Sequence, residues 1–478
     1  WGITAVLLKT AATAAASVGP APGSDTSVGN LGGIVGQNGD EDSGGGTVTN
    51  CYNTGNFGSF INSTVGGVVG NNGATVDKCY FLKTETVNAG QAGIGNDNTH
   101  TGATAVSDLT NQNEFKGWDF DNTWRISTDK KHPVLQANAE DNALSGTGTQ
   151  EDPYKIYRAI DLKNFRDLVN GEVDQTADPD AHAKLMNNID LSSVCGESNS
   201  WTPIGTSSNP YTDTFNGQNF KISGLYINSN TDYQGLFGFV GSTGTVQNRV
   251  EGTITVTASS SGDSTSYIYV GGIVAYNNGG SVTNCTSTVA ITATTTEGGI
   301  SDVYVGGVVG ENFDSTVTNC YNTGEVISGN IGGGVVGLNG SGSVTNCYNT
   351  GKVSGSFAGG VVGSVGSGSV SNCYNTGSVS VVGTGSSSVA GGVVGENRNG
   401  ASVTNCYFLQ TADVNENLPS IGKNEGNSDD ATGKTDTAFH SGEVAWRLQD
   451  GQTDGSSQVW GQSKLEDENS WPTLIALD

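Results

Sequence analysis

The residues of this chain best placed for chemistry are its eight cysteines. Thiolates bind zinc as closely spaced Cys pairs with histidine nearby, and the sequence contains no such pair. The spacing therefore argues against zinc and leaves two interpretations: a column of free buried thiols, which we favour, or disulfides between neighbouring repeats. All cysteines except Cys195 occupy the same position of a repeated sequence: Cys51, Cys79, Cys285, Cys320, Cys347, Cys373 and Cys406.

Side chains for acid–base catalysis do not form a recognisable motif. The four histidines lie outside any H-E-x-x-H sequence, which a metallopeptidase would require. A glycan lyase or hydrolase would need paired carboxylates on one strand face, or calcium ligands. Four acids fall instead at expected corners or loop starts: Glu311, Asp314, Glu325 and Glu396. We therefore predict no catalytic residues and keep a glycan-active enzyme as an alternative.

The charge of the chain limits its partners. The sequence has 47 acidic and 20 basic residues, a net charge of −27. This charge repels phosphates, so we exclude nucleic acid and disfavour anionic membrane surfaces. Calcium binding stays possible because hard cations take oxygen ligands, in which this chain is rich. The candidate calcium ligands are Asp40, Glu41 and Asp42, and the alternative interpretation of this cluster is a solvated turn. No stretch approaches the roughly 20 apolar residues of a membrane span, so we expect no membrane insertion and no other cofactor.

A repeat positions these residues. It consists of Gly-Gly-Val-Val-Gly-x-Asn followed by Val-Thr-Asn-Cys-Tyr-Asn-Thr-Gly, and its basic length is 26 or 27 residues. Glycine at corners and valine between them predict a stack of β-coils, because one coil alone cannot bury its apolar face. The predicted fold class is all-β, a parallel β-helix-like solenoid in two arrays. The copies start at Gly32, Gly66, Gly235, Gly271, Gly306, Gly333, Gly359 and Gly391.

Stacking would bring equivalent residues into columns about 4.8 Å apart. Two columns are predicted as structural ladders: Cys285, Cys320, Cys347, Cys373 and Cys406, and the corner residues Asn319, Asn346, Asn372 and Asn405. Arg249 stands at the cysteine position of the degenerate copy, so we expect that coil to be an end coil or to face a partner group. Each Thr-Val-Thr is expected to present one outward threonine, which argues against an ice-binding grid.

Two arrays end alike, each with Cys-Tyr-Phe-Leu, a polar stretch, a Trp-rich segment and a Pro-x-Leu closure. We interpret each Trp-rich closure as a cap over the open end of a solenoid. The chain starts at Trp1 rather than Met, so we expect the first unit to be truncated. The predicted organisation is a first unit with its cap (1–138), a linker (139–154), an N-terminal cap with irregular coils (155–232), the second array (233–412) and a C-terminal cap (413–478).

Two further elements are expected in the second unit. Apolar residues at helical spacing in Arg158 to Val169 predict one short helix that covers the first coils. Insertions before some Gly-Gly corners alternate as strand, turn and strand, and predict hairpin-like flanges that project from one face. These insertions run from Thr253 to Val270, from Thr286 to Val305 and from Ser378 to Val389.

The sequence resembles the GLUG-motif repeat, whose Gly-Leu-x-Gly core appears here as Gly235-Leu236-Phe237-Gly238 with Gly-Gly-Val-Val-Gly variants elsewhere. The resemblance implies a right-handed solenoid from a large secreted or wall-attached bacterial protein, such as an adhesin or the non-catalytic region of an immunoglobulin-A metallopeptidase. It supplies no catalytic residues.

We therefore expect a non-catalytic extracellular adhesin or stalk whose projecting loops bind a host or neighbouring-cell protein or glycan, with self-association left open. The alternative is a non-catalytic arm of a large secreted protease or carbohydrate-active enzyme.

Overall fold

The computed structural model describes residues 30–38, 47–56, 64–96, 102–120, 123–127, 131–135, 144–172, 176–258, 267–295, 302–382, 388–425, 428–449, 458–462 and 471–475. The chain divides into two compact units, Trp1–Ala143 and Leu144–Asp478, which are described separately.

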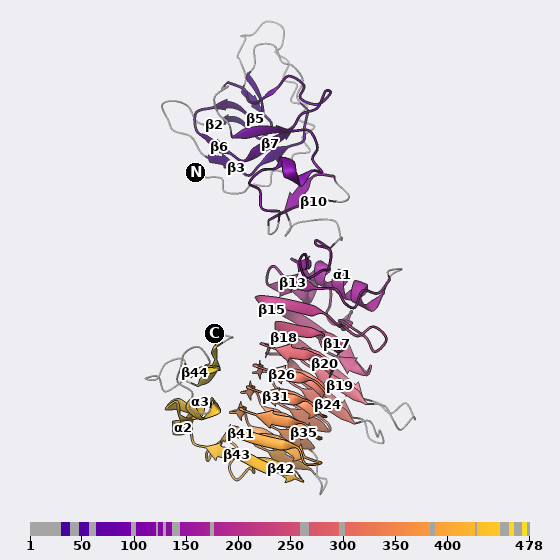
Figure 1. Ribbon diagram of the computed structural model, residues 1–478, viewed down its shortest axis with the longest axis vertical. Helices are drawn as coiled ribbons and strands as arrows, with labels where there is room; N and C mark the ends of the chain where they lie inside the picture. The colour runs from indigo at the N-terminus through magenta and orange to yellow at the C-terminus, as the bar shows by residue number, and fades with distance from the viewer. Residues whose placement is uncertain are drawn as a thin grey trace. The chain divides into compact units, whose positions relative to one another are not determined.

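The second unit is a solenoid of parallel strands, which confirms the predicted fold class (Figure 1). Each regular rung contributes strands to three sheets of 6, 7 and 19 strands. The six-stranded sheet contains β16 (Tyr233–Gln234), β19 (Ile268–Gly271), β24 (Val303–Gly306), β29 (Ile331–Gly333), β34 (Phe357–Gly359) and β39 (Val389–Gly391). The seven-stranded sheet contains β17 (Phe237–Val240), β20 (Val274–Asn278), β25 (Val309–Phe313), β30 (Val336–Asn339), β35 (Val362–Val365), β40 (Val394–Asn397) and β42 (Ile421–Asn424).

The 19-stranded sheet holds the remaining strands of the stack. They are β12 (Tyr154–Ile156), β13 (Ala183–Leu185), β14 (Ile189–Asp190), β15 (Thr214–Ser229), β18 (Thr245–Ala258), β21 (Ser281–Thr283), β22 (Thr286–Ser287), β23 (Ala290–Thr295), β26 (Thr316–Thr318), β27 (Tyr321–Asn322), β28 (Val326–Ser328), β31 (Ser343–Thr345), β32 (Tyr348–Asn349), β33 (Val353–Gly355), β36 (Ser369–Ser371), β37 (Tyr374–Asn375), β38 (Val379–Val381), β41 (Ser402–Leu409) and β43 (Ser428–Lys434).

Register places identical residues above one another. Val317, Val344, Val370 and Val403 pair in sequence across β26, β31, β36 and β41, and each is fully buried. The glycine of each Gly-Gly corner is needed because two strands of one rung approach closely: a Cβ on Gly306 would lie 1.9 Å from the carbonyl oxygen of Val309. Valine is therefore the commonest residue of the thin core between the three sheets.

Helix α1 (Ala159–Asn170) lies where the sequence predicts a helix. The Asp161 carboxylate accepts the backbone N–H of Arg158 at 3.0 Å, and Gly171, with φ of 71°, ends the helix. Phe165 is fully buried against the aromatic side chains of the first coils. The helix thus contributes its apolar face to the core at the start of the stack.

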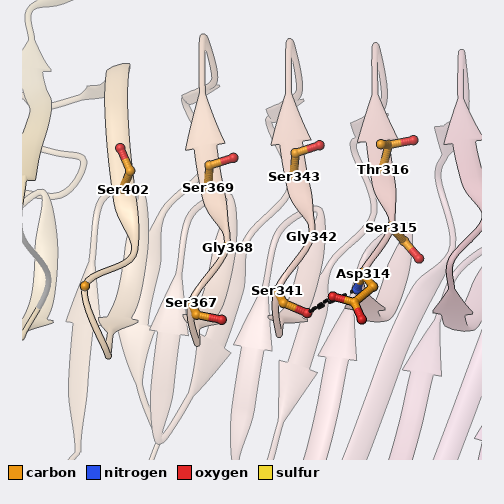
Figure 2. Close-up of a pocket in the computed structure, with 11 residues that line it drawn as sticks. Asp314, Ser315, Thr316, Ser341, Gly342, Ser343, Ser367, Gly368, Ser369 and Ser402 are labelled. Atoms are coloured by element: carbon orange, nitrogen blue, oxygen red, sulfur yellow. Dashed lines mark hydrogen bonds between the residues drawn. The ribbon is translucent and has the colours of Figure 1, made fainter.

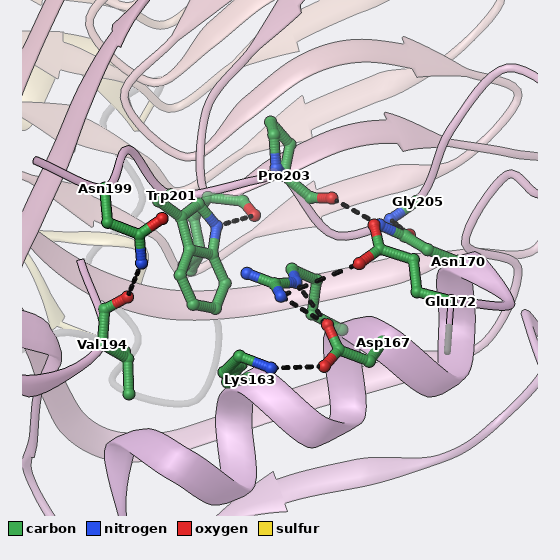
Figure 3. A network of polar contacts seen from close by, with 11 residues as sticks. Lys163, Asp167, Asn170, Glu172, Val194, Asn199, Trp201, Pro203 and Gly205 are labelled. Atoms are coloured by element: carbon green, nitrogen blue, oxygen red, sulfur yellow. Dashed lines mark hydrogen bonds and ion pairs between the residues drawn. The ribbon is translucent and has the colours of Figure 1, made fainter. Parts of the chain in front are cut away.

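A polar network also joins α1 to the first coils (Figure 3). The Arg166 guanidinium pairs with Asp167 and lies 5.0 Å from the ring centre of Trp201. The Asn170 side chain accepts the backbone N–H of Gly205 at 2.8 Å. These contacts satisfy the buried charge of Arg166 and fix the helix on the stack.

The Trp-rich C-terminal segment lies against the side of the stack rather than covering its end (Figure 1). It comprises α2 (Asp436–His440), α3 (Glu443–Leu448) and the antiparallel strands β44 (Trp460–Gln462) and β45 (Pro472–Leu474). Its buried residues pack on the tyrosine column formed by Tyr348, Tyr374 and Tyr407. Two helices here were not predicted, since their apolar residues are few and their partners are distant in sequence.

The first unit repeats this design on a smaller scale. Its strands are β1 (Asn30–Gly32), β2 (Val35–Asn38), β3 (Thr47–Thr49), β4 (Tyr52–Asn53), β5 (Thr64–Asn72), β6 (Thr75–Asp77), β7 (Cys79–Leu82), β8 (Ala92–Ile94), β9 (Ala103–Val106), β10 (Trp124–Ile126) and β11 (Pro133–Leu135). The hydroxyl of Tyr52 donates to the carbonyl of Pro133 at 2.6 Å, as the hydroxyl of Tyr374 donates to Pro472 at 2.6 Å in the second unit. Both Trp-rich segments are therefore anchored on a tyrosine column.

The hairpin prediction for the insertions is wrong within the described residues. Strand β18 pairs in parallel with β23, and β19 pairs in parallel with β24, so each strand of an insertion extends a sheet from rung to rung. The residues between these strands, 259–266, 296–301 and 383–387, lie outside the described part of the chain. Coil-to-coil backbone pairing takes precedence over a local hairpin.

Candidate ligand-binding face

The cysteine column lies in the core. All eight cysteines are free, and Cys195 lies apart from the column, where its thiol donates to the carbonyl of Gly224 at 3.4 Å. Burial raises the pKa of the Cys320 and Cys373 thiols. Such thiols are packing groups rather than nucleophiles. The members with no exposed surface in the second unit are Cys285, Cys320, Cys347, Cys373 and Cys406.

The corner asparagines share a left-handed backbone conformation, but their side chains do not form a continuous ladder. Four of them have φ between 50° and 55°: Asn319, Asn346, Asn372 and Asn405. The side chain of Asn405 donates to Asn372 at 2.7 Å, and Asn319 donates to Asn284 at 3.3 Å. Among these described residues Asn346 makes no side-chain bond to its column neighbours. Asparagine tolerates this left-handed conformation better than other side chains with a Cβ.

The continuous amide ladders run through other positions of the repeat. Asn322 donates to Asn349, and Asn349 donates to Asn375, each at 2.9 Å, and all three are fully buried. A second ladder joins Asn277 to Asn312 at 3.1 Å and continues to Asn339 at 2.9 Å. These asparagines belong to the Gly-x-Asn and Asn-Thr-Gly parts of the repeat. The sequence does not show which of the asparagines in each repeat point inward.

The acids placed at corners by sequence analysis include two that lie on strands. Glu311 is in β25 and Glu396 is in β40, and they are 7% and 2% exposed. Burial opposes ionisation of Glu396, but hydrogen bonds from Arg398 and Lys423 lower its pKa below the usual value. Burial raises the pKa of Glu311 to about 7, although the hydroxyl of Tyr269 is hydrogen-bonded to it.

The two glutamates do not form a catalytic pair. They occupy the same register column, with Leu338 and Ser364 between them. Glu311 lies instead beside a tyrosine cluster, in which the rings of Tyr269 and Tyr304 stack with centres 5.6 Å apart. A glycosidase needs two carboxyl groups across one scissile bond, and this column does not bring them together.

The outward face of β21, β26, β31, β36 and β41 is a regular hydroxyl surface. Each strand has the pattern Ser or Thr, buried Val, Ser or Thr, so both flanking hydroxyls point outward. The expectation of one outward threonine per coil is therefore wrong. One column consists of Ser281, Thr316, Ser343, Ser369 and Ser402, and the other of Thr283, Thr318, Thr345, Ser371 and Thr404.

A groove runs along one edge of this hydroxyl face (Figure 2). Its volume is about 520 Å³. Its lining consists of serine, threonine and glycine together with one acid, Asp314, which accepts a hydrogen bond from the hydroxyl of Ser341. A lining of this kind can donate and accept many hydrogen bonds, but it holds a single titratable group.

Two segments of the sequence, residues 266–292 and 301–327, match the family described as "The GLUG motif". The chain contains GLUG repeats. A relative from Evansella cellulosilytica, named "Putative Gly-rich membrane protein", is 36% identical over 119 residues, which are 24% of this chain and 13% of that protein. A solved structure from Bacteroides ovatus, described as a putative immunoglobulin A1 protease, has a TM-score of 0.44 and 20% identity, and the match covers 70% of this chain and 95% of that chain.

Arg249, in the degenerate copy that starts at Gly235, is not at the cysteine position. It pairs with Thr286, the neighbour of Cys285, and its side chain is exposed. Strand β18 continues straight where the other copies in the second unit insert a left-handed asparagine, so the alignment shifts by one residue. Asn248, 3% exposed, takes the inward place instead.

The remaining expectations concern ions and membranes. The calcium candidates Asp40, Glu41 and Asp42 lie outside the described residues. Within the described ranges, no group of three or more His, Cys, Asp or Glu side chains is arranged to hold a metal ion. None of the helices found in those ranges has the length and hydropathy to cross a membrane.

Proposed function

We propose that this chain is a non-catalytic region of a bacterial surface or secreted protein, and that its hydroxyl face binds a glycan of a host or neighbouring cell. The observation that carries the proposal is the hydroxyl face itself, which continues in register from Ser281 to Ser402. The solenoid supplies a rigid support for that face, since its regular rungs are hydrogen-bonded to one another along three sheets.

The groove composition favours binding over catalysis. Asp314 supplies the one carboxyl group among the described residues that line the groove, and its carboxylate accepts a hydrogen bond from the hydroxyl of Ser341. Acid–base cleavage of a glycosidic bond uses two carboxyl groups in different protonation states. Two other glutamates of the stack, Glu311 and Glu396, are buried and belong to a different sheet.

A hydroxyl face suits a ligand that is itself rich in hydroxyls. Each hydroxyl both donates and accepts, and neighbouring rungs repeat it about every 4.8 Å. A single hydrogen bond contributes only about 0.5–1.5 kcal/mol net, so useful affinity requires contacts on several rungs. An extended polysaccharide can make such contacts together, and a small sugar cannot.

The experiment compares polysaccharide binding by the wild type and a variant with Thr316→Val, Ser343→Ala and Ser369→Ala. These changes remove three outward hydroxyls and keep the strand shape. A matched control, Thr255→Val with Thr292→Val, removes paired hydroxyls from another part of the same sheet. We expect co-sedimentation with insoluble polysaccharides for the wild type and the control, and at least tenfold weaker binding for the triple variant. Equal binding by the triple variant, or no binding by the wild type to any of a broad panel, refutes the proposal.

A further inference from the structure

A second, smaller pocket lies near the first coils of the second unit. Its volume is about 70 Å³. A water molecule needs about 10–15 Å³ of such space, so the pocket has room for a small polar group but not for a sugar ring. It is lined by amides and one guanidinium: Asn216, Gln218, Asn219, Gln247, Asn248, Arg249 and Asn284.

Asn248 provides a buried donor that has no partner. It is 3% exposed, and its Oδ1 accepts the backbone N–H of Arg249 at 2.8 Å, which fixes the orientation of the amide. The Nδ2 group makes no hydrogen bond with any described residue. A buried amide normally satisfies its donors, so this group calls for an acceptor from outside the protein.

The other side chains of the pocket also offer donors. Oδ1 of Asn216 accepts the backbone N–H of Gln218 at 2.9 Å, so its amino group is left to donate. Arg249 is exposed and forms no ion pair within the described ranges. Guanidinium and amide N–H groups together match the oxygens of a carboxylate or sulfate.

The local charge also favours an anion. Lys221 is the register partner of Arg249 on the adjacent strand. The ammonium group of Lys221 forms an ion pair with the carboxylate of Glu251 at 3.0 Å, which leaves the guanidinium of Arg249 as the unpaired charge of the two within the described residues. The net charge of −27 belongs to the whole chain, and screening limits its effect to about 8 Å at physiological ionic strength. At the distance of a hydrogen bond, the Arg249 guanidinium therefore determines the sign of the interaction.

The pocket opens at one end of the hydroxyl face. Gln247 pairs with Asn216 on the adjacent strand, and Thr245, two residues earlier, is the register partner of Ser281 in the hydroxyl column. A chain lying along the hydroxyl columns would reach the pocket.

We propose that this pocket binds a small anionic group, a carboxylate or sulfate, on an acidic glycan. The glycan part rests on the proposed function above. The donor set of Asn248, Asn216 and Arg249 does not depend on it.

The test measures calorimetric binding of three oligosaccharides: oligogalacturonate, its methyl ester and a sulfated glycan. The wild type should bind one of the two acidic ligands at least tenfold more tightly than the ester, and the preferred acid identifies the group. Arg249→Gln should weaken that binding by about ten- to a hundredfold. The control Lys352→Gln, at an exposed lysine paired with Glu325 on a different coil, should leave it unchanged.

A second measurement uses acetate and sulfate alone. Either anion should shift the side-chain amide resonance of Asn248 in a saturable way in the wild type, and the shift should be absent in Arg249→Gln. If these anions shift Asn248 but no glycan binds, the anion pocket stands and the glycan function fails. If acid and ester bind equally and neither anion shifts Asn248, the pocket is refuted while the glycan function stands. Equal binding by Arg249→Gln and the wild type also refutes the pocket.

Discussion

Replacing Glu311 with glutamine should remove a pH dependence from the stability of the second unit. Burial raises the pKa of the Glu311 carboxyl from 4.5 to about 7, although the hydroxyl of Tyr269 is hydrogen-bonded to it. Between these values the folded state holds a proton that the unfolded chain releases. One pKa unit corresponds to about 1.4 kcal/mol, so a contribution of about 3 kcal/mol, fully present below pH 4.5, is lost as the pH rises through 7.

The assay is urea unfolding of the wild type and Glu311→Gln between pH 4 and pH 8, at constant ionic strength and followed by circular dichroism. Other carboxyl groups titrate in both proteins and cancel in the difference. We expect the free energy of unfolding of the wild type, minus that of the variant, to fall by about 3 kcal/mol over this range. Carbon-13 spectra should place the titration midpoint of Glu311 near 7.

Glu396 is the matched control because it lies in the same register column but has cations beside it. Hydrogen bonds from Arg398 and Lys423 outweigh burial and lower its pKa, so its stabilisation is present above the unfolded value and is lost as the pH falls. Glu396→Gln should therefore change the pH profile with the opposite sign. Profiles of Glu311→Gln and wild type that run parallel within about 0.5 kcal/mol would refute the reasoning.

Three further changes test the packing, and one tests access to the core. Val335→Asp should cost about 4 kcal/mol or more because it buries an unpaired charge at a fully buried position, and an unchanged melting curve would contradict that burial. Asn349→Ala breaks a buried amide ladder and should lower the free energy of unfolding in urea by about 3 kcal/mol, whereas a loss below about 1 kcal/mol would make the ladder dispensable. Tyr374→Phe removes the hydrogen bond to Pro472 and should cost about 1 kcal/mol, seen as faster proteolysis of the C-terminal segment than in the wild type. Cys347 should resist iodoacetamide in the folded protein and react in urea, and labelling under native conditions would disprove its burial.

The repeat was sufficient to predict the stack and its core. The same order of motif residues within each copy brings each residue above its equivalent, although insertions make the distance between copies unequal, and valine with cysteine at fixed positions supplies the apolar column. The helix α1 was also predictable, because its apolar spacing is local and Asp161 marks its start. In each case the deciding interactions are local or lie between identical neighbours.

The sequence by itself determined that identical coils stack in parallel with valines and thiols inside. Only the tertiary structure decided which asparagines are buried, that Glu311 lies on a strand, that the Trp-rich segments pack on tyrosine columns, and that Arg249 faces outward. The physical reason is that a column position depends on register between coils. One residue fewer at a corner, as before Arg249, changes which side chain takes the inward position there, and no pattern within a single coil records that change.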